Sequence, residues 1–244
     1  MNKKYRQIIL DTETTGFKPE AGDRIIEFAA LEMIDRKLTG EKLHFYVNPE
    51  RDIDEAAVSI HGIRYEDVKD EPVFTYRVPE IINFVQDSEL IIHNAKFDLN
   101  FLNYQFNLEK SNIPDLQNFD SYIVGVIDTL VLARHKYPGG KNSLDALCDR
   151  FGINRSNRSY HGALIDCELL AEVYLILTKE QINLLEDDSK NINNIVTEFI
   201  PVETLGLNLK IIHPSLEEIE LHNQYLQTLD KISQGMSTWF NQVK

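Results

Sequence analysis

The order of its apolar segments is the feature that most constrains the fold of this chain. The first three segments are short, rich in bulky and β-branched residues and separated by polar residues, as β-strands are: Tyr5–Leu10, Arg24–Met33 and Leu43–Val47. We expect these three strands to form the antiparallel start of a sheet. The chain therefore begins with strands, and the helical patterns come later.

Farther along the chain, strand patterns alternate with helical patterns. Two apolar segments predict further strands, Glu89–His93 and Val124–Ile127. Apolar residues at helical spacing predict helices over Val78–Val85, Lys96–Leu108 and Gly162–Lys179, and a shorter helix runs from the cap Ser143 to the stop Gly152. Strands first, then strands alternating with helices, indicate an α/β domain in which helices flank a mixed central sheet.

The composition changes near residue 180. Glu186–Asn194 is polar and poor in large apolar residues, which is typical of a linker. Beyond it, Pro214–Lys231 is amphipathic, and the only tryptophan, Trp239, lies in the last part of the chain. We therefore predict a main domain over residues 1–180, a linker over 181–199 and a C-terminal segment over 200–244 that is too short to bury its own core.

Two acidic residues, Asp11 and Glu13, follow the first predicted strand. Side chains two apart on an extended backbone point to the same face, so both carboxylates project to one side. Two negative charges this close are unfavourable unless a cation lies between them, and hard oxygen ligands favour Mg²⁺ or Mn²⁺. The alternative is a helix cap, which the turn signals Thr14–Gly16 and Pro19 disfavour.

Three further residues at the ends of predicted elements can join this pair. Asp98 comes just after a buried strand, where open α/β sheets place their sites, although an acid that starts a helix is the alternative. Asp166 heads an otherwise apolar helical stripe, and a core-facing carboxylate requires a partner or a metal. His161 precedes that helix and is a general-base candidate beside a metal cluster, or otherwise a cap or surface residue. Together, the four acids and the histidine predict a two-metal site for phosphodiester hydrolysis.

The charge of the chain limits how it can hold nucleic acid. Asp and Glu outnumber Lys and Arg 39 to 25, which gives a net charge of −14. A protein that holds duplex by itself usually neutralises phosphates with a basic face. Either nucleic acid is not the substrate, or the chain touches only a strand end through metal ions and another protein holds the DNA.

Three motifs resemble those of the DEDDh superfamily of 3′→5′ exonucleases: DTETTG at residues 11–16, HNAKFD at 93–98 and HGALID at 161–166. All three occur in order with suitable separations. The similarity covers residues 5–180 and extends, through Arg36–Gly40, Ile60–Ile63 and Asn142–Cys148, to the epsilon family of proofreading subunits of bacterial DNA polymerase III. The resemblance implies an RNase H-like fold and an exonuclease that removes mispaired 3′-terminal nucleotides.

The resemblance also implies roles for individual residues. The ligands of two Mg²⁺ or Mn²⁺ ions would be Asp11, Glu13, Asp98 and Asp166. The substrate contacts would come from Asp11, Glu13, His61 and Asp166. His161 would deprotonate the attacking water. One position departs from the family, because the glutamate usual five residues before His61 is replaced by Ala56, with Glu55 beside it.

Four other positions match the family, and we interpret them as structural. His93 and Asn94 belong to the second motif, while Asp128 and Asp145 stand at positions suited to a turn and a cap.

The C-terminal part of the chain points to protein partners. Gln181–Leu185 resembles the short glutamine–leucine motif by which bacterial proteins bind the sliding clamp, with a plain helix end as the alternative. The final segment, including Glu217–His222 and Trp239, resembles the tail that binds the catalytic (alpha) subunit of polymerase III. Such a tether would let the polymerase supply the grip on DNA. A small accessory subunit is a further partner that the family implies.

Two alternatives to a proofreading subunit stay open: a stand-alone exonuclease acting on RNA or small oligonucleotides, and a non-catalytic adaptor that organises a polymerase. The location expected from the sequence is the cytoplasm. No apolar run approaches the ~20 residues of a membrane helix, and MNKKYRQIILDTE has no signal-peptide pattern. The cysteines Cys148 and Cys167 form no metal-ligand spacing and no disulfide framework.

Overall fold

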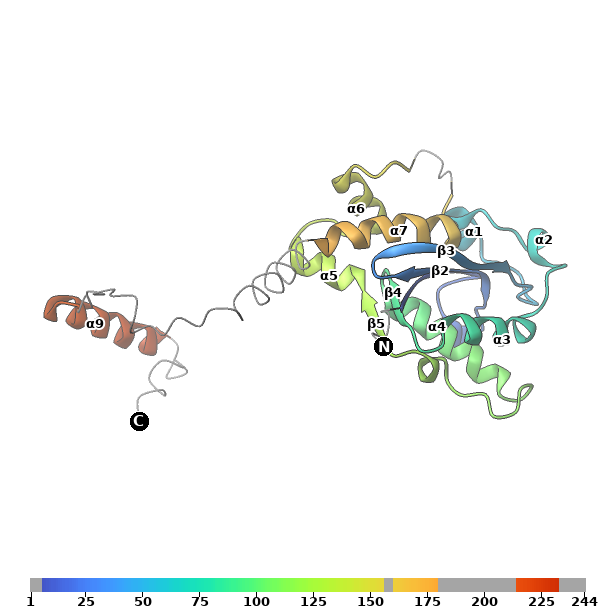
Figure 1. The fold of residues 1–244 in the computed structure, drawn as a ribbon, viewed down its shortest axis with the longest axis horizontal. Coiled ribbons are helices and arrows are strands. Elements are labelled where there is room, and N and C mark those ends of the chain that lie inside the picture. The colour runs from blue at the N-terminus through green and yellow to red at the C-terminus, as the bar shows by residue number, and fades with distance from the viewer. Residues whose placement is uncertain (1–5, 156–159, 180–213, 233–244) are drawn as a thin grey trace, which may run out of the picture. The chain divides into compact units, whose positions relative to one another are not determined.

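The computed structural model describes residues 6–155, 160–179 and 214–232 (Figure 1). The chain divides into two units, residues 1–188 and 189–244. The second unit contributes one described helix, α9 (Leu216–Ile232), which begins with a capping box between Ser215 and Glu218. All other described elements belong to the first unit. The predicted linker and the motif Gln181–Leu185 lie outside the described residues.

A five-stranded mixed sheet forms the centre of the first unit, as predicted. Its strands are β1 (Arg6–Thr14), β2 (Ile25–Ile34), β3 (Lys37–Tyr46), β4 (Glu89–Ile92) and β5 (Gly125–Asp128). They lie in the order β3-β2-β1-β4-β5. The first three strands pair antiparallel, whereas β4 pairs parallel with both β1 and β5. The carboxyl ends of β1, β4 and β5 therefore meet at one edge of the sheet.

Helices cover both faces of this sheet (Figure 1). The helices of the first unit are α1 (Glu55–His61), α2 (Tyr65–Val68), α3 (Phe74–Val85), α4 (Ala95–Glu109), α5 (Thr129–Lys136), α6 (Leu144–Phe151) and α7 (Ala163–Leu177), with 3₁₀ turns η1 (Pro19–Ala21) and η2 (Phe119–Tyr122). One face carries α3 and α4, and the other carries α6 and α7. Among the described residues, no helix combines the length and the apolar character needed to span a bilayer.

The alternation of side chains along the strands builds two separate cores. In β1, Ile8 and Leu10 pack toward α3 and α4, whereas Ile9 packs toward α7. The same alternation divides Leu90 and Ile92 from Ile91 in β4. Because both faces of the sheet are buried at these positions, Ile8–Leu10 and Leu90–Ile92 are unbroken apolar runs in the sequence.

The first strand is longer than the sequence predicted. Instead of ending at Leu10, β1 continues to Thr14 because its residues keep pairing with β2 after the parallel pairing with β4 has ended at Ile9. Asp11 and Glu13 are therefore part of the strand and lie at its carboxyl end. Their placement on one face is unaffected.

Two local predictions about helices are confirmed. The hydroxyl of Ser143 accepts a hydrogen bond from the backbone N–H of Ala146, and Gly152 ends the same helix in a left-handed conformation. In α7, the stripe that begins at Asp166 is buried along its whole length. Cys148 and Cys167 are both buried.

An aromatic cluster is expected to dominate the stability of the α4 face. The ring of Phe106 is fully buried and lies edge-on to Phe74 and Phe119, at centroid distances of 6.0 and 5.3 Å. Phe106→Ala should lower the free energy of unfolding by about 3–5 kcal/mol, because it removes apolar contacts and leaves a cavity. Urea denaturation measures this loss. The exposed Tyr76→Ala on α3 is the control and should change stability by less than about 0.5 kcal/mol; an equal effect of both variants would contradict this account of the core.

Candidate active site

Three carboxylates from two elements meet at the carboxyl end of β1. Asp11 and Glu13 lie on the face of the sheet that α7 covers, and Asp166 lies one turn into α7. Each residue offers one carboxylate oxygen, and these oxygens lie within 4.8 Å of one another. Asp166 is buried, whereas Asp11 and Glu13 are half-buried. The cluster therefore has a closed side against α7 and an open side toward solvent.

Asp98 reaches the same end of the sheet from the opposite face. It lies in the first turn of α4, and its Oδ1 accepts hydrogen bonds from the backbone N–H of Thr12 at 3.1 Å and from the Thr12 hydroxyl at 2.7 Å. Thr12 lies beyond the point where β1 stops pairing with β4, so its N–H has no partner on that strand. The carboxylate of Asp98 accepts this hydrogen bond instead. Asp98 is thus fixed next to the cluster but stands outside the group of three.

Burial and neighbouring charges raise the pKa of two of the four acids, Asp11 and Asp98. Burial raises the pKa of Asp11 well above its ordinary value, and the charges of Asp98, Glu13, Asp166 and Glu27 raise it further. Burial also raises the pKa of Asp98 to about 7, although the hydrogen bonds from Thr12 oppose that shift. In the absence of a cation, the folded chain therefore holds negative charges that repel each other.

His161 lies in the loop immediately before α7. Its backbone N–H donates to the carbonyl of Ile60 at 3.1 Å, which ties this loop to α1. Its Nδ1 lies 3.3 Å from Oδ2 of Asp166, and 44% of its side chain is exposed. The imidazole is thus held at the carboxylate cluster and reaches solvent, as the sequence predicted for a residue that precedes this helix.

Glu27 is a buried acid of the site that the sequence analysis missed. It lies on β2 opposite Glu13, with its side chain 3% exposed. Its Oε1 lies 2.8 Å from Nε2 of His44, and its Oε2 accepts a hydrogen bond from the backbone N–H of Ala163 at 3.1 Å. Glu27 therefore fixes the first residue of α7 to the sheet, between His161 and Asp166. The only signal in the sequence is a glutamate between apolar residues of a predicted strand.

His61 ends α1 and is buried against the end of β1. Its Nε2 lies 3.2 Å from the carbonyl oxygen of Thr14, and its Nδ1 accepts from the backbone N–H of Ile63 at 3.1 Å. Burial lowers the pKa of His61, so the ring is neutral near pH 7. The ring ties α1 to the strand that carries Asp11 and Glu13. Its predicted contact with the substrate stays a prediction.

Three other positions singled out in the sequence have defined surroundings. Glu55, beside Ala56 on α1, is 82% exposed, with Arg64 3.5 Å away. Asp128 caps α5 through the N–H groups of Leu130 and Val131, and it also accepts from the N–H groups of Asn94 and Ala95 at the start of α4. Asp145 pairs with Arg155 at 3.1 Å. The interpretation of Asp128 as a cap is confirmed.

The donor set of the cluster suits a hard divalent cation. Its atoms are carboxylate oxygens, which Mg²⁺ and Mn²⁺ prefer, and the distances between them allow one ion to contact several. A cation between the three carboxylates would also neutralise the repulsion that raises the pKa of Asp11. Asp98 is positioned to extend the site toward the α4 side.

Comparisons with known proteins agree with this geometry. The family model described as Exonuclease matches residues 8–174, which include all five predicted catalytic and metal-binding residues. Two curated proteins, each called DNA polymerase III subunit epsilon, are similar over nearly the whole chain. The protein from Pasteurella multocida (strain Pm70) is 42% identical and covers 98% of this chain and 95% of its own length. The protein from Rickettsia prowazekii (strain Madrid E) is 44% identical and covers 93% and 96%.

A solved structure shares the fold. Exonuclease X in complex with 5′ overhanging duplex DNA is 27% identical to this chain, with a TM-score of 0.52, and the match covers 71% of this chain and 92% of that one. The matched share of this chain is no longer than the first unit. The RNase H-like exonuclease fold predicted from the motifs is confirmed.

The repulsion within the cluster generates a prediction about stability. In metal-free buffer at pH 8, Asp11→Asn should melt a few degrees above the parent, since about 1 kcal/mol corresponds to ~2–4 °C in a domain of this size. The sign follows from the raised pKa of Asp11: the parent is stable while Asp11 is protonated and loses stability as the pH rises above about 4. The advantage of the variant should therefore grow with pH.

Scanning calorimetry with and without Mg²⁺ measures this difference. Mg²⁺ should raise the melting temperature of the parent more than that of the variant. The exposed Asp70→Asn is the control and should match the parent in both buffers. An Asp11→Asn chain that melts below the parent without metal would contradict the repulsion.

Proposed function

Because this chain belongs to the exonuclease family, and within it to the DNA polymerase III epsilon subunits, we propose that it removes mispaired 3′-terminal nucleotides from DNA by two-metal hydrolysis. The observation that carries the proposal is the meeting of Asp11, Glu13 and Asp166 within 4.8 Å, with His161 beside them. The similarity to epsilon subunits over nearly the full chain favours a proofreading role over a stand-alone nuclease acting on RNA or small oligonucleotides.

The four acids hold the two ions in this proposal. Asp11, Glu13 and Asp166 contribute the oxygens that lie together, and Asp98 contributes from the α4 side. When bound, two Mg²⁺ or Mn²⁺ ions supply Lewis-acid stabilisation of the attacking and leaving oxygens. Asp11, Glu13 and Asp166 thereby lie next to the scissile phosphate, and His61 lies at the end of β1 where the terminal nucleotide would bind.

His161 is the general base. With its Nδ1 held near Asp166, the tautomer protonated on Nδ1 leaves the basic lone pair on Nε2. Nε2 takes a proton from the attacking water, whose oxygen forms a bond to phosphorus. The bond from phosphorus to the 3′ oxygen of the next nucleotide breaks, and that oxygen gains a proton from solvent. The products are a nucleoside 5′-monophosphate and a strand shorter by one residue.

The net charge of −14 fits a nuclease that another protein brings to DNA. The proposed partner is the polymerase III catalytic subunit, bound through residues 200–244. The described part of this segment, α9, exposes the large side chains of Ile219, Leu221 and Tyr225. An isolated helix cannot bury such side chains, so they suit a protein surface.

Two further contacts belong to the proposal. Gln181–Leu185 would bind the sliding clamp as a short peptide. A small accessory subunit is the second further partner. Both contacts are proposed from the resemblance of the sequence.

The proposed base can be tested by His161→Gln, which removes the basic nitrogen and keeps a polar side chain. The turnover number for a 3′-mispaired DNA should fall by about 10²–10⁴-fold, as is typical for the loss of a general base. Mg²⁺ binding, measured by calorimetry, should be retained. The acidic limb of the rate profile against pH should disappear, because a general base acts only when it is unprotonated.

His222→Gln on α9 is the control for this experiment and should hydrolyse DNA like the parent. A His161→Gln chain that turns over at the parental rate, or that keeps the acidic limb, would refute the assignment of the base.

The proposed tether can be tested in the full-length chain. Ile219→Glu with Leu221→Glu places two charges on the exposed apolar side chains of α9. These changes should abolish co-elution with the polymerase catalytic subunit and leave hydrolysis of short single strands unchanged. A chain truncated at Asp187 should behave in the same way.

The substitution Gln224→Glu on the same helix is the matched control, since it adds charge at a polar position. Normal co-elution of the double variant would argue against the tether. Loss of hydrolysis on truncation would mean that the tail belongs to the catalytic fold.

A further inference from the structure

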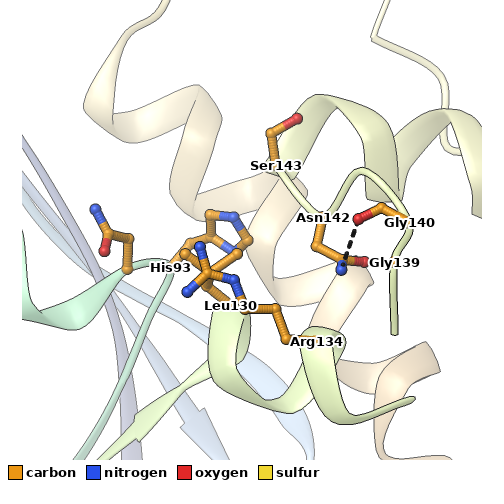
Figure 2. A pocket seen from close by; sticks show the side chains of 8 residues that line it. His93, Leu130, Arg134, Gly139, Gly140, Asn142 and Ser143 are labelled. Carbon is orange, nitrogen blue, oxygen red and sulfur yellow. Dashed lines mark hydrogen bonds between the residues drawn. The ribbon is translucent and has the colours of Figure 1, made fainter. Parts of the chain in front are cut away.

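A pocket of about 600 Å³ opens at the carboxyl end of β4, between helix α5 and the loop before α6 (Figure 2). One wall is formed by His93 and Asn94, which lead directly from β4 into the helix that carries Asp98. The opposite wall is formed by Gly139, Gly140 and Ser143. The pocket therefore lies at the same edge of the sheet as the proposed active site.

The charged residue of the pocket lining is a cation, Arg134. Figure 2 shows its side chain directed from α5 toward His93. Arg134 is exposed, and within the described parts of the chain it forms no ion pair. The neighbouring loop adds Lys141, while Arg150 is held by the carbonyl of Lys141 and by Asn142. In a chain with a net charge of −14, Arg134 thus places a cation at the end of the sheet that carries the acidic cluster.

The other groups of the pocket are neutral and fixed. The Nδ1 of His93 lies 2.9 Å from the hydroxyl of Thr129, and burial lowers the pKa of His93, so its ring carries no charge near pH 7. Asn142 anchors the glycine loop by donating to the carbonyls of Tyr137 and Gly140. Nothing lies within 4 Å of the position that a Cβ would take at Gly139. The wall thus lets a ligand approach the backbone closely.

We propose that this pocket binds a backbone phosphate of the single strand whose 3′ end lies at the carboxylate cluster, with the guanidinium of Arg134 as its main partner. A planar guanidinium can donate two hydrogen bonds to one phosphate. Because Arg134 forms no ion pair within the described residues, an anion is the ligand that its charge favours. His93 and Asn94 lead into the helix that carries Asp98, so a strand that left the metal site along this end of the sheet would pass the pocket. This inference rests on the proposed function and adds a strand contact to it.

The test compares two substrates of the full-length chain. A single-stranded oligodeoxynucleotide can reach both the cluster and the pocket, whereas the p-nitrophenyl ester of thymidine 5′-monophosphate reaches only the cluster. Arg134→Ala should raise KM for the oligonucleotide roughly tenfold, as expected for one charge-assisted hydrogen bond. Its kinetics with the ester should equal those of the parent. The slope of log KM against log salt should fall by about 0.7, the value for one phosphate of a single strand.

Two further variants make the comparison sharper. Arg134→Lys keeps the charge without the planar fork and should recover part of the loss. Lys37→Ala removes an exposed cation from β3, at the opposite edge of the sheet, and should leave both substrates unaffected.

Four results would overturn the inference. Equal kinetics of Arg134→Ala and the parent on the oligonucleotide would exclude the contact. An equal loss on both substrates would place Arg134 in the metal site or in the fold. Competition by inorganic phosphate in the parent, lost in Arg134→Ala without any change in KM, would mean that the pocket takes free phosphate instead of a strand. A parent that hydrolyses neither substrate would overturn the proposed function itself, and this inference with it.

Discussion

Repulsion between carboxylates is the constraint around which this fold is organised. Asp11, Glu13 and Asp166 share a volume a few ångströms wide, and burial together with the neighbouring charges raises the pKa of Asp11. Such an arrangement persists only because the surrounding elements fix it. The continuous pairing of β1 with β2 holds the first two acids, and the packing of α7 on the sheet holds the third. The energy stored in the repulsion becomes affinity for divalent cations.

Groups outside the cluster position its members. Glu27 ties the first residue of α7 to β2, Thr12 fixes Asp98, and Asp128 caps the helices on both sides of the pocket. These contacts include hydrogen bonds from backbone N–H groups that have no partner within the strands and helices, because they lie at the ends of these elements. The same hydrogen bonds that complete the secondary structure therefore also set the geometry of the site. The cation Arg134 lies just outside this network, where a strand would pass.

The sequence predicted the parts of this arrangement that depend on local periodicity. The alternation of a strand placed Asp11 and Glu13 on one face, and the stripe of a helix placed Asp166 against the core. Local periodicity could not predict the role of Glu27. Its hydrogen bond with the backbone of Ala163 joins residues 136 positions apart and depends on how α7 packs on the sheet. The length of β1 was underestimated because its last residues are polar and are held by pairing with β2.

The central claim is that the cluster binds two divalent ions. Mn²⁺ added to the full-length chain in the presence of thymidine 5′-monophosphate can be followed by the electron paramagnetic resonance signal of the unbound ion. The account predicts saturation at two ions per chain, and a lower stoichiometry or affinity when Asp11 is replaced by Asn. Saturable binding that is the same in parent and variant, or no saturable binding at all, would contradict it.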